Sequence, residues 1–260
     1  RTISDVAFLD AKVITAQISL LRSRLSEPEI ERFRHLGSLC AEAITATAYS
    51  IHPGMSEFEI AAQLGKEAQQ RGVQPIVNLI ATDERAMAFR HPLPTAKTLN
   101  HYVLLVLSGR KSGLVCSISR MVHFGKLPDE LQARIQAAAQ VNAALIASSR
   151  PGKTLGEILK IGQQAYAAAG FPDEWQQHHQ GGLTGYEPRE ILATPDESLT
   201  LEARQVVAWN PTVQGAKMED SVVLNDYGFE VLTNTPAWPL QMVQFAGQAD
   251  PAPCALALRL

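Results

Sequence analysis

Apolar residues recur at helical spacing in two long stretches of the chain, residues 27–51 and 128–149. Apolar positions three and four apart share one face of a helix, so each stretch predicts a helix with one buried side. Each stretch is followed by a segment of the same form, PGMSEFEI from position 53 and PGKTLGEI from position 151. The two segments begin 98 residues apart and indicate an internal repeat.

In each copy of the repeat, a hydroxyl residue stands three positions before a glutamate, Ser56 before Glu59 and Thr154 before Glu157. This is the spacing of a capping box, in which the two residues satisfy each other's free N–H groups at the start of a helix. A glycine follows 19 residues after the proline of each copy, where the helix is expected to end. The chain is therefore interpreted as two similar halves, each with two helices followed by strands.

Short apolar runs after each helix pair predict the strands. Residues 109–113, with a glycine at each end, are expected to turn a hairpin, and residues 225–228 a second one. Helices segregated from largely antiparallel strands favour an α+β fold. The runs are VNLIA (77–81), YVLLVLSG (102–109), GLVCSISRMV (113–122), QVVAWNPTV (205–213), DSVVLND (220–226) and FEVLT (229–233).

Charge and composition narrow the range of partners. The chain has 23 basic and 26 acidic residues, a net charge of −3, which argues against binding to nucleic acid or to a membrane surface. No apolar run reaches the roughly 18 residues of a membrane span. The cysteines Cys40, Cys116 and Cys254 lie far apart, which excludes a disulfide framework or a cysteine zinc site. With no signal-peptide pattern, these features predict a cytoplasmic protein.

The repeat, the predicted hairpin around 103–120 and the segments HHQGGLTGYEPRE and AWNPTVQGAKMEDSVV together resemble one family. It is the superfamily of proline-specific aminopeptidases, methionine aminopeptidases and creatinase. The resemblance implies a pita-bread fold, with two similar helix-helix-strand halves around a curved, mostly antiparallel sheet. It places that domain at residues 29–245, after an extension of residues 1–28 and before a loose C-terminal tail of residues 246–260.

Peptidases of this family hold two divalent metals with two aspartates, one histidine and two glutamates. The resemblance places the two aspartates at Val106 and Ser117, the latter three positions before an arginine. It places the histidine at His178, and the glutamates at Asn210, beside a proline, and at Glu219. Three of these five positions therefore depart from the family pattern.

The chemistry of the remaining donors argues against a metal pair. Two hard dications need several anionic oxygens to offset their charge, and of the five positions only Glu219 supplies a carboxylate. Valine has no donor atom, and serine and asparagine are neutral. Because no Asp or Glu occurs between Glu84 and Asp129, the predicted hairpin contains no acidic residue at all. We therefore expect no dinuclear site and no cofactor.

The polar residues of the expected cleft suggest another chemistry. The resemblance implies a substrate-contacting histidine where Arg90-His91-Pro92 stands, and a histidine titrates near neutral pH. His91 and His178 are therefore the candidate catalytic residues. Lys217 beside Glu219 favours an ion pair. The candidate ligand-binding residues are His179, Tyr186, Glu187, Arg189, Glu190, Lys217 and Glu219.

Three functions remain open at this point. The first is a metal-independent, creatinase-like hydrolase or lyase that acts on a small C–N compound, with peptidase activity not expected. The second is a non-catalytic pseudo-peptidase that binds a ligand or partner. The third is a metal-dependent aminopeptidase whose ligands lie elsewhere in the chain. In each case we expect a small-molecule ligand or substrate, and the family resemblance favours a homodimer.

Overall fold

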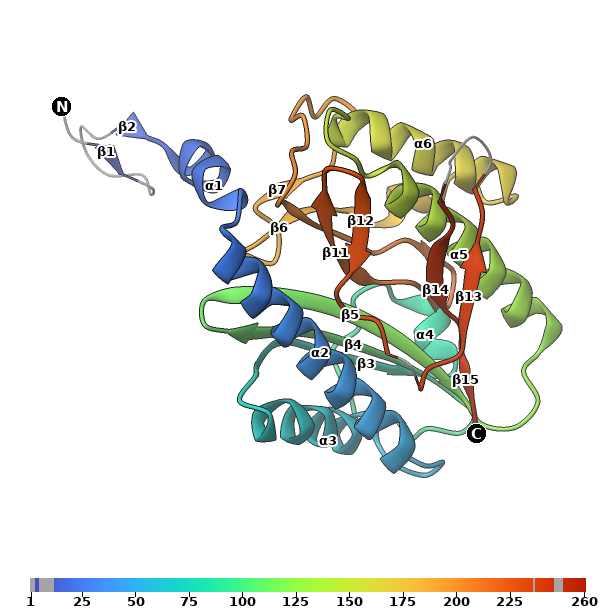
Figure 1. Ribbon diagram of the computed structural model, residues 1–260. Coiled ribbons are helices and arrows are strands. Elements are labelled where there is room, and N and C mark those ends of the chain that lie inside the picture. Colours follow the sequence, from blue (N-terminus) through green and yellow to red (C-terminus); the bar gives the residue numbers. More distant parts are fainter. Residues whose placement is uncertain (1–2, 5–11, 236, 246–249) are drawn as a thin grey trace.

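Two antiparallel sheets, each accompanied by a pair of helices, form the body of the computed structural model (Figure 1). The structure describes residues 3–4, 12–235, 237–245 and 250–260. Its helices are α1 (Thr15–Ser23), α2 (Glu27–Ser50), α3 (Glu57–Gln70), α4 (Glu84–Ala88), α5 (Asp129–Ser148), α6 (Leu155–Ala168) and the 3-10 helix η1 (Glu174–Gln177).

The first sheet has the strand order β15-β5-β4-β3 and the second the order β12-β11-β8-β6-β7. Both are built mainly from antiparallel pairs, so the expected α+β class with mostly antiparallel strands is confirmed. The strands are β1 (Ile3–Ser4), β2 (Lys12–Val13), β3 (Gln74–Thr82), β4 (Tyr102–Lys111), β5 (Leu114–His123), β6 (Gly181–Thr184), β7 (Ile191–Leu192), β8 (Val206–Trp209), β9 (Thr212–Val213), β10 (Ala216–Lys217), β11 (Asp220–Asn225), β12 (Gly228–Val231), β13 (Leu240–Val243), β14 (Ala252–Ala255) and β15 (Leu258–Arg259).

Both copies of the repeat begin a helix through the predicted capping box. The Ser56 N–H donates to the Glu59 carboxylate at 2.7 Å, and the Glu59 N–H donates to the Ser56 hydroxyl at 3.2 Å. Thr154 and Glu157 make the same two hydrogen bonds, at 2.8 and 3.1 Å. These bonds satisfy N–H groups that the first turn of a helix leaves free. The repeat is therefore a structural duplication of the start of α3 and of α6.

The helix pairs cover different sheets. The helices α2 and α3 pack against the first sheet, whereas α5 and α6 pack on each other beside the strands of the second half (Figure 1). The buried apolar side chains form two clusters, one for each helix pair. One lies under α2 and α3, and the other lies around α5 and α6. The two sheets meet where the Ser119 N–H donates to the backbone oxygen of Glu219 at 3.1 Å.

The C-terminal segment differs from the loose tail expected at 246–260. Residues 250–260 contain two strands, and β15 pairs in parallel with β5, Leu258 opposite Val122. Cys254 of β14 is fully buried. The segment is ordered because β14 packs against α5 and pairs with β13, while Leu258 lies at the edge of the first sheet. Residues 246–249 lie outside the described part of the chain.

Within the described residues, no helix is long and apolar enough to cross a membrane. Near the N-terminus, β1, β2 and α1 extend away from the two sheets (Figure 1).

Candidate functional site

A cavity of about 130 Å³ lies between the β4–β5 hairpin and the strands of the second half. Part of its wall is apolar, formed by Val77, Leu79, Val106 and Pro188. The polar side chains that line it come from segments far apart in the sequence. They are His91, Ser108, Ser117, His179, Arg189, Asn210, Lys217 and Glu219.

Strand alternation places the hairpin residues in this cavity. Val106 and Ser108 are two apart on β4, and Ser117 and Ser119 are two apart on β5, so all four side chains share one face of the sheet. Val106 lies opposite Ser119, and the hydroxyls of Ser108 and Ser117 are 2.9 Å apart. The sequence interpretation missed Ser108 and Ser119, although the same period of two would have identified both.

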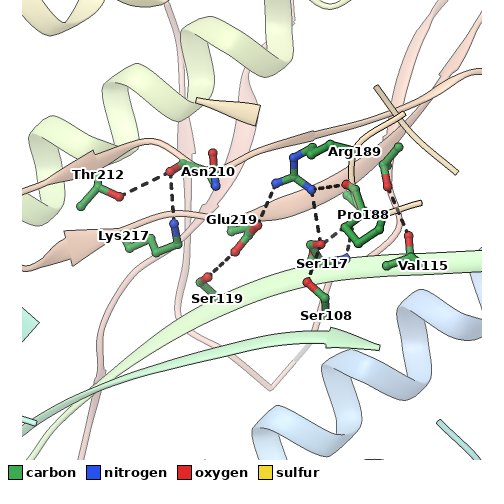
Figure 2. Close-up of polar contacts among 12 residues, drawn as sticks. Ser108, Val115, Ser117, Ser119, Pro188, Arg189, Asn210, Thr212, Lys217 and Glu219 are labelled. Atoms are coloured by element: carbon green, nitrogen blue, oxygen red, sulfur yellow. Dashed lines mark hydrogen bonds and ion pairs between the residues drawn. The ribbon is translucent and has the colours of Figure 1, made fainter. Parts of the chain in front are cut away.

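Glu219 is the carboxylate in this cavity, and both of its oxygens are bonded (Figure 2). One accepts the Ser119 hydroxyl at 2.6 Å, and the other accepts a guanidinium N–H of Arg189 at 3.1 Å. Burial acts to raise the pKa of Glu219, but the positive Lys217 and Arg189 and these hydrogen bonds outweigh it and lower the pKa. Glu219 is therefore ionised and already paired with a cation.

The loop after β6 fixes the position of Arg189. The Glu190 carboxylate, whose side chain is fully buried, accepts the N–H groups of Tyr186 and Glu187 at 2.9 and 3.1 Å. It also pairs with Arg22 of α1 at 2.8 Å. Tyr186, Glu187 and Glu190 were predicted to bind ligand, but the structure places them outside the cavity wall, where they hold the loop that carries Arg189.

Three histidines meet beside the cavity. The ring centroid of His91 is 5.3 Å from that of His178 and 5.5 Å from that of His179. An ion pair of 2.5 Å between Arg90 and Glu174 ties the loop of His91 to η1, which immediately precedes His178. The three histidine rings that the sequence analysis assigned to one cleft thus lie close together.

The histidines differ in their access to the cavity. His91 and His179 line it and are exposed at its mouth. His178 is half-buried, is absent from the cavity wall, and has no hydrogen-bond partner on either ring nitrogen within the described residues. His178 therefore lies behind His91 rather than in the cavity wall itself.

Their surroundings hold all three histidines in the neutral form. Loss of water lowers the pKa of His91, and the positive Lys217 lowers it further. The same two causes place the pKa of His178 far below its usual range. Loss of water and the positive Arg189 also lower the pKa of His179. At pH 7 each ring is therefore uncharged.

Lys217 is buried, with 1% of its surface exposed. The expected ion pair with Glu219 is not formed, because Glu219 pairs with Arg189 instead. Within the described chain Lys217 forms no ion pair, and its ammonium donates one long hydrogen bond of 3.4 Å to the backbone oxygen of Asn210 (Figure 2). Burial lowers the pKa of Lys217 to about 8.

Comparison with known proteins identifies the architecture. Residues 31–226 match the pattern of metallopeptidase family M24. The chain belongs to this family. The prolidase from Pyrococcus furiosus has a similar structure, with a TM-score of 0.79, 21% identity and coverage of 84% of this chain and 67% of that one. The X-Pro aminopeptidase from Thermotoga maritima MSB8 also has a similar structure, with a TM-score of 0.81 and 19% identity. The match covers 96% of this chain and 68% of that one.

Curated relatives of this M24 chain are longer than it is. It is 26% identical over 232 residues to an uncharacterized peptidase of Staphylococcus haemolyticus, covering 85% of this chain and 65% of that protein. An uncharacterized peptidase of Staphylococcus aureus strain MW2 is also 26% identical, and the match covers 84% of this chain and 64% of that protein. The chain thus spans slightly less than two thirds of these relatives.

The cavity brings together most of the positions that the family resemblance assigns to the metal pair. Four of the five family positions, Val106, Ser117, Asn210 and Glu219, line it together, so the fold brings them to one place. Their one carboxylate is held by Arg189, whose positive charge repels a dication. Across the described residues, no group of three or more His, Cys, Asp or Glu side chains is placed to hold a metal ion.

Proposed function

We propose that this member of family M24 has lost the dinuclear metal site and acts as a metal-independent hydrolase or lyase on a small C–N compound. The observation that carries the proposal is the ion pair of 3.1 Å between Arg189 and Glu219. In the family's metal site, carboxylates face metal ions, whereas here the remaining carboxylate faces a guanidinium. The cavity of about 130 Å³ is also small beside the roughly 300–1,000 Å³ of pockets for drug-sized ligands.

The chain's own side chains would then supply the chemistry. Hydrolysis of a C–N bond requires a base that takes a proton from water and an acid that protonates the leaving nitrogen. His91 is neutral at pH 7, lines the cavity and can take both roles in turn. Arg189 and Lys217 are cations beside it, suited to stabilise the negative charge that develops on oxygen in such a reaction.

Metal content tests the first half of this proposal. The purified protein, dialysed and then incubated with Zn²⁺, Mn²⁺ or Co²⁺, should carry well under one ion per chain by mass spectrometry, because one paired carboxylate cannot balance a dication. A content near two ions per chain would contradict the loss of the site and favour a metal-dependent aminopeptidase.

Activity in the presence of a chelator tests the second half. The protein is incubated with a panel of small amides, ureas and guanidino compounds while EDTA is present to remove free metal. It should release ammonia or an amine from at least one of these compounds. His91→Gln should remove this activity, whereas His35→Gln, which changes an exposed histidine of α2, should leave it intact. If the protein binds panel members without any turnover, the alternative of a non-catalytic binding module replaces the hydrolase.

A further inference from the structure

The charges around the cavity do not balance. Lys217 and Arg189 are cations, and Glu219 is the acidic residue that lines the cavity with them. Glu219 is already used, because its two oxygens accept Arg189 and the Ser119 hydroxyl. Arg90, the other nearby cation, is paired with Glu174 at 2.5 Å. Lys217 feels the charge of Glu219 but has no carboxylate at ion-pair distance among the described residues.

Lys217 is poorly satisfied for a buried ammonium. It has three N–H donors, and the structure gives it one hydrogen bond, the long one of 3.4 Å to Asn210. Leaving a buried charge without a partner is strongly unfavourable, so such groups normally face a counter-ion or a ligand. Because Lys217 lines the cavity, the space beside it is where an anionic group would be stabilised.

Asn210 places a second, independent requirement on the ligand, that of a hydrogen-bond donor. It lines the same cavity, is 2% exposed, and its side-chain oxygen Oδ1 is buried without a hydrogen-bond donor in the part of the chain described. An amide oxygen accepts hydrogen bonds, so its natural partner is an N–H or O–H group. The apolar wall of Val77, Leu79 and Val106 completes the cavity and leaves room for a short carbon skeleton.

From these residues we propose that the cavity binds a small carboxylic acid that also carries an N–H or O–H donor. Its carboxylate pairs with Lys217, and its donor bonds to Asn210 Oδ1. The inference rests on the proposed function only in placing the ligand in the same cavity, and it names the class of compound that enters.

Pairs of small molecules that differ in one group test, in the parent protein, whether the ligand must carry a negative charge. Propionate and propionamide have nearly the same shape and differ in charge, so calorimetric titration should give at least about tenfold tighter binding of propionate. Lactate should bind more tightly than isobutyrate, which has a methyl group in place of the hydroxyl. Equal binding of propionate and propionamide, or equal binding of chloride and propionate, would overturn the carboxylate assignment.

A variant then locates the carboxylate. Lys217→Met keeps the length of the side chain and removes the charge, and it should weaken propionate binding at least about tenfold. Lys160→Met, an exposed lysine of α6, is the control and should bind propionate like the parent. Because the variant removes a poorly paired buried charge, its melting temperature should equal or exceed that of the parent. Unchanged propionate binding by Lys217→Met would place the anion elsewhere and end the proposal.

The outcomes separate this inference from the proposed function. Carboxylate binding that depends on Lys217, without hydrolysis of any C–N compound, would support the inference and contradict the hydrolase. Hydrolysis of neutral amides by a protein that binds propionate and propionamide equally would support the hydrolase and contradict the inference.

Discussion

At the scale of single residues, the site is governed by which cation takes Glu219. Arg189 and Lys217 both influence its pKa, but Arg189 forms the ion pair, at 3.1 Å. One terminal nitrogen of Arg189 donates to Glu219 and the other donates to the backbone oxygen of Pro188 at 2.6 Å, so the planar guanidinium is held in place for this pairing. Lys217 and the neutral histidines are left as the groups available to a ligand, which makes their protonation the main variable of the site.

Stability should fall in acid because of the histidines. Their pKa values are lowered in the folded protein from an ordinary value of 6.5, so the unfolded chain binds more protons below that pH. The contribution of the histidines to the free energy of unfolding should therefore be constant above pH 7 and decrease as the pH falls from about 6.5 toward 4. The lowered pKa of Glu219 acts in the same direction at lower pH.

Urea denaturation between pH 8 and 4 measures this effect. Replacing the half-buried His178 with Asn should flatten the decrease more than replacing the exposed His35 with Asn. A free energy of unfolding that stays level between pH 7 and 5 in the parent would show that these rings are not held neutral by the fold.

At the scale of elements, the helices and strands were predictable and the loops were not. The capping boxes and apolar periods identified α2, α3, α5 and α6 and the β4–β5 hairpin because these signals depend on neighbouring residues. The roles of Tyr186, Glu187 and Glu190 depend on Arg22, which is distant in the sequence and whose approach no local pattern reveals.

One buried carboxylate, which no local pattern of residues indicates, anchors the loop of His91 at both ends. Glu57 of α3 accepts the N–H groups of Thr82 at 2.8 Å and Thr95 at 2.9 Å, and it pairs with Arg85 at 3.1 Å. Thr82 and Arg85 precede His91, and Thr95 follows it. Glu57 thus holds the residues on either side of the histidine to the start of a helix.

Glu57→Gln should loosen this loop. The variant exchanges charged hydrogen bonds, worth about 1.5–3 kcal/mol each, for neutral ones, and we expect a loss of about 2–3 kcal/mol in the free energy of unfolding. Hydrogen exchange should show faster exchange confined to residues 83–98. Glu67→Gln on the same helix, which removes an i,i+4 pair with Arg71, should cost no more than about 0.5 kcal/mol. If hydrogen exchange instead becomes faster to the same extent throughout the chain, Glu57 has no local role in this loop.

At the scale of the whole molecule, the site forms where the two halves meet. Val106 and Ser117 come from the first sheet, and Asn210 and Glu219 come from the second half of the chain, yet all four line one cavity. The family resemblance predicted this set by position, and the fold brings it together. His178 is the member that the structure places apart from the cavity wall.

This convergence predicts that a metal site can be built. Val106→Asp, Ser117→Asp and Asn210→Glu would give four carboxylates with Glu219. The triple variant should be less stable than the parent without metal, since like charges repel. Mn²⁺ at 100 times its dissociation constant should restore about 2.7 kcal/mol and raise the melting temperature.

The control is the uncharged counterpart Val106→Asn, Ser117→Asn and Asn210→Gln, which should show no response to Mn²⁺. If the melting temperature of the carboxylate variant is also indifferent to Mn²⁺, the four positions do not converge closely enough to bind an ion.

The parallel pairing of β15 with β5 has a consequence for the order in which the molecule matures on the ribosome. Residues 258–259 complete a sheet whose other strands were made far earlier, so the edge of β5 has no partner while the second half is being synthesised. Such an open edge invites pairing with other chains. The nascent chain therefore passes through a period of vulnerability to aggregation before β15 pairs with this edge.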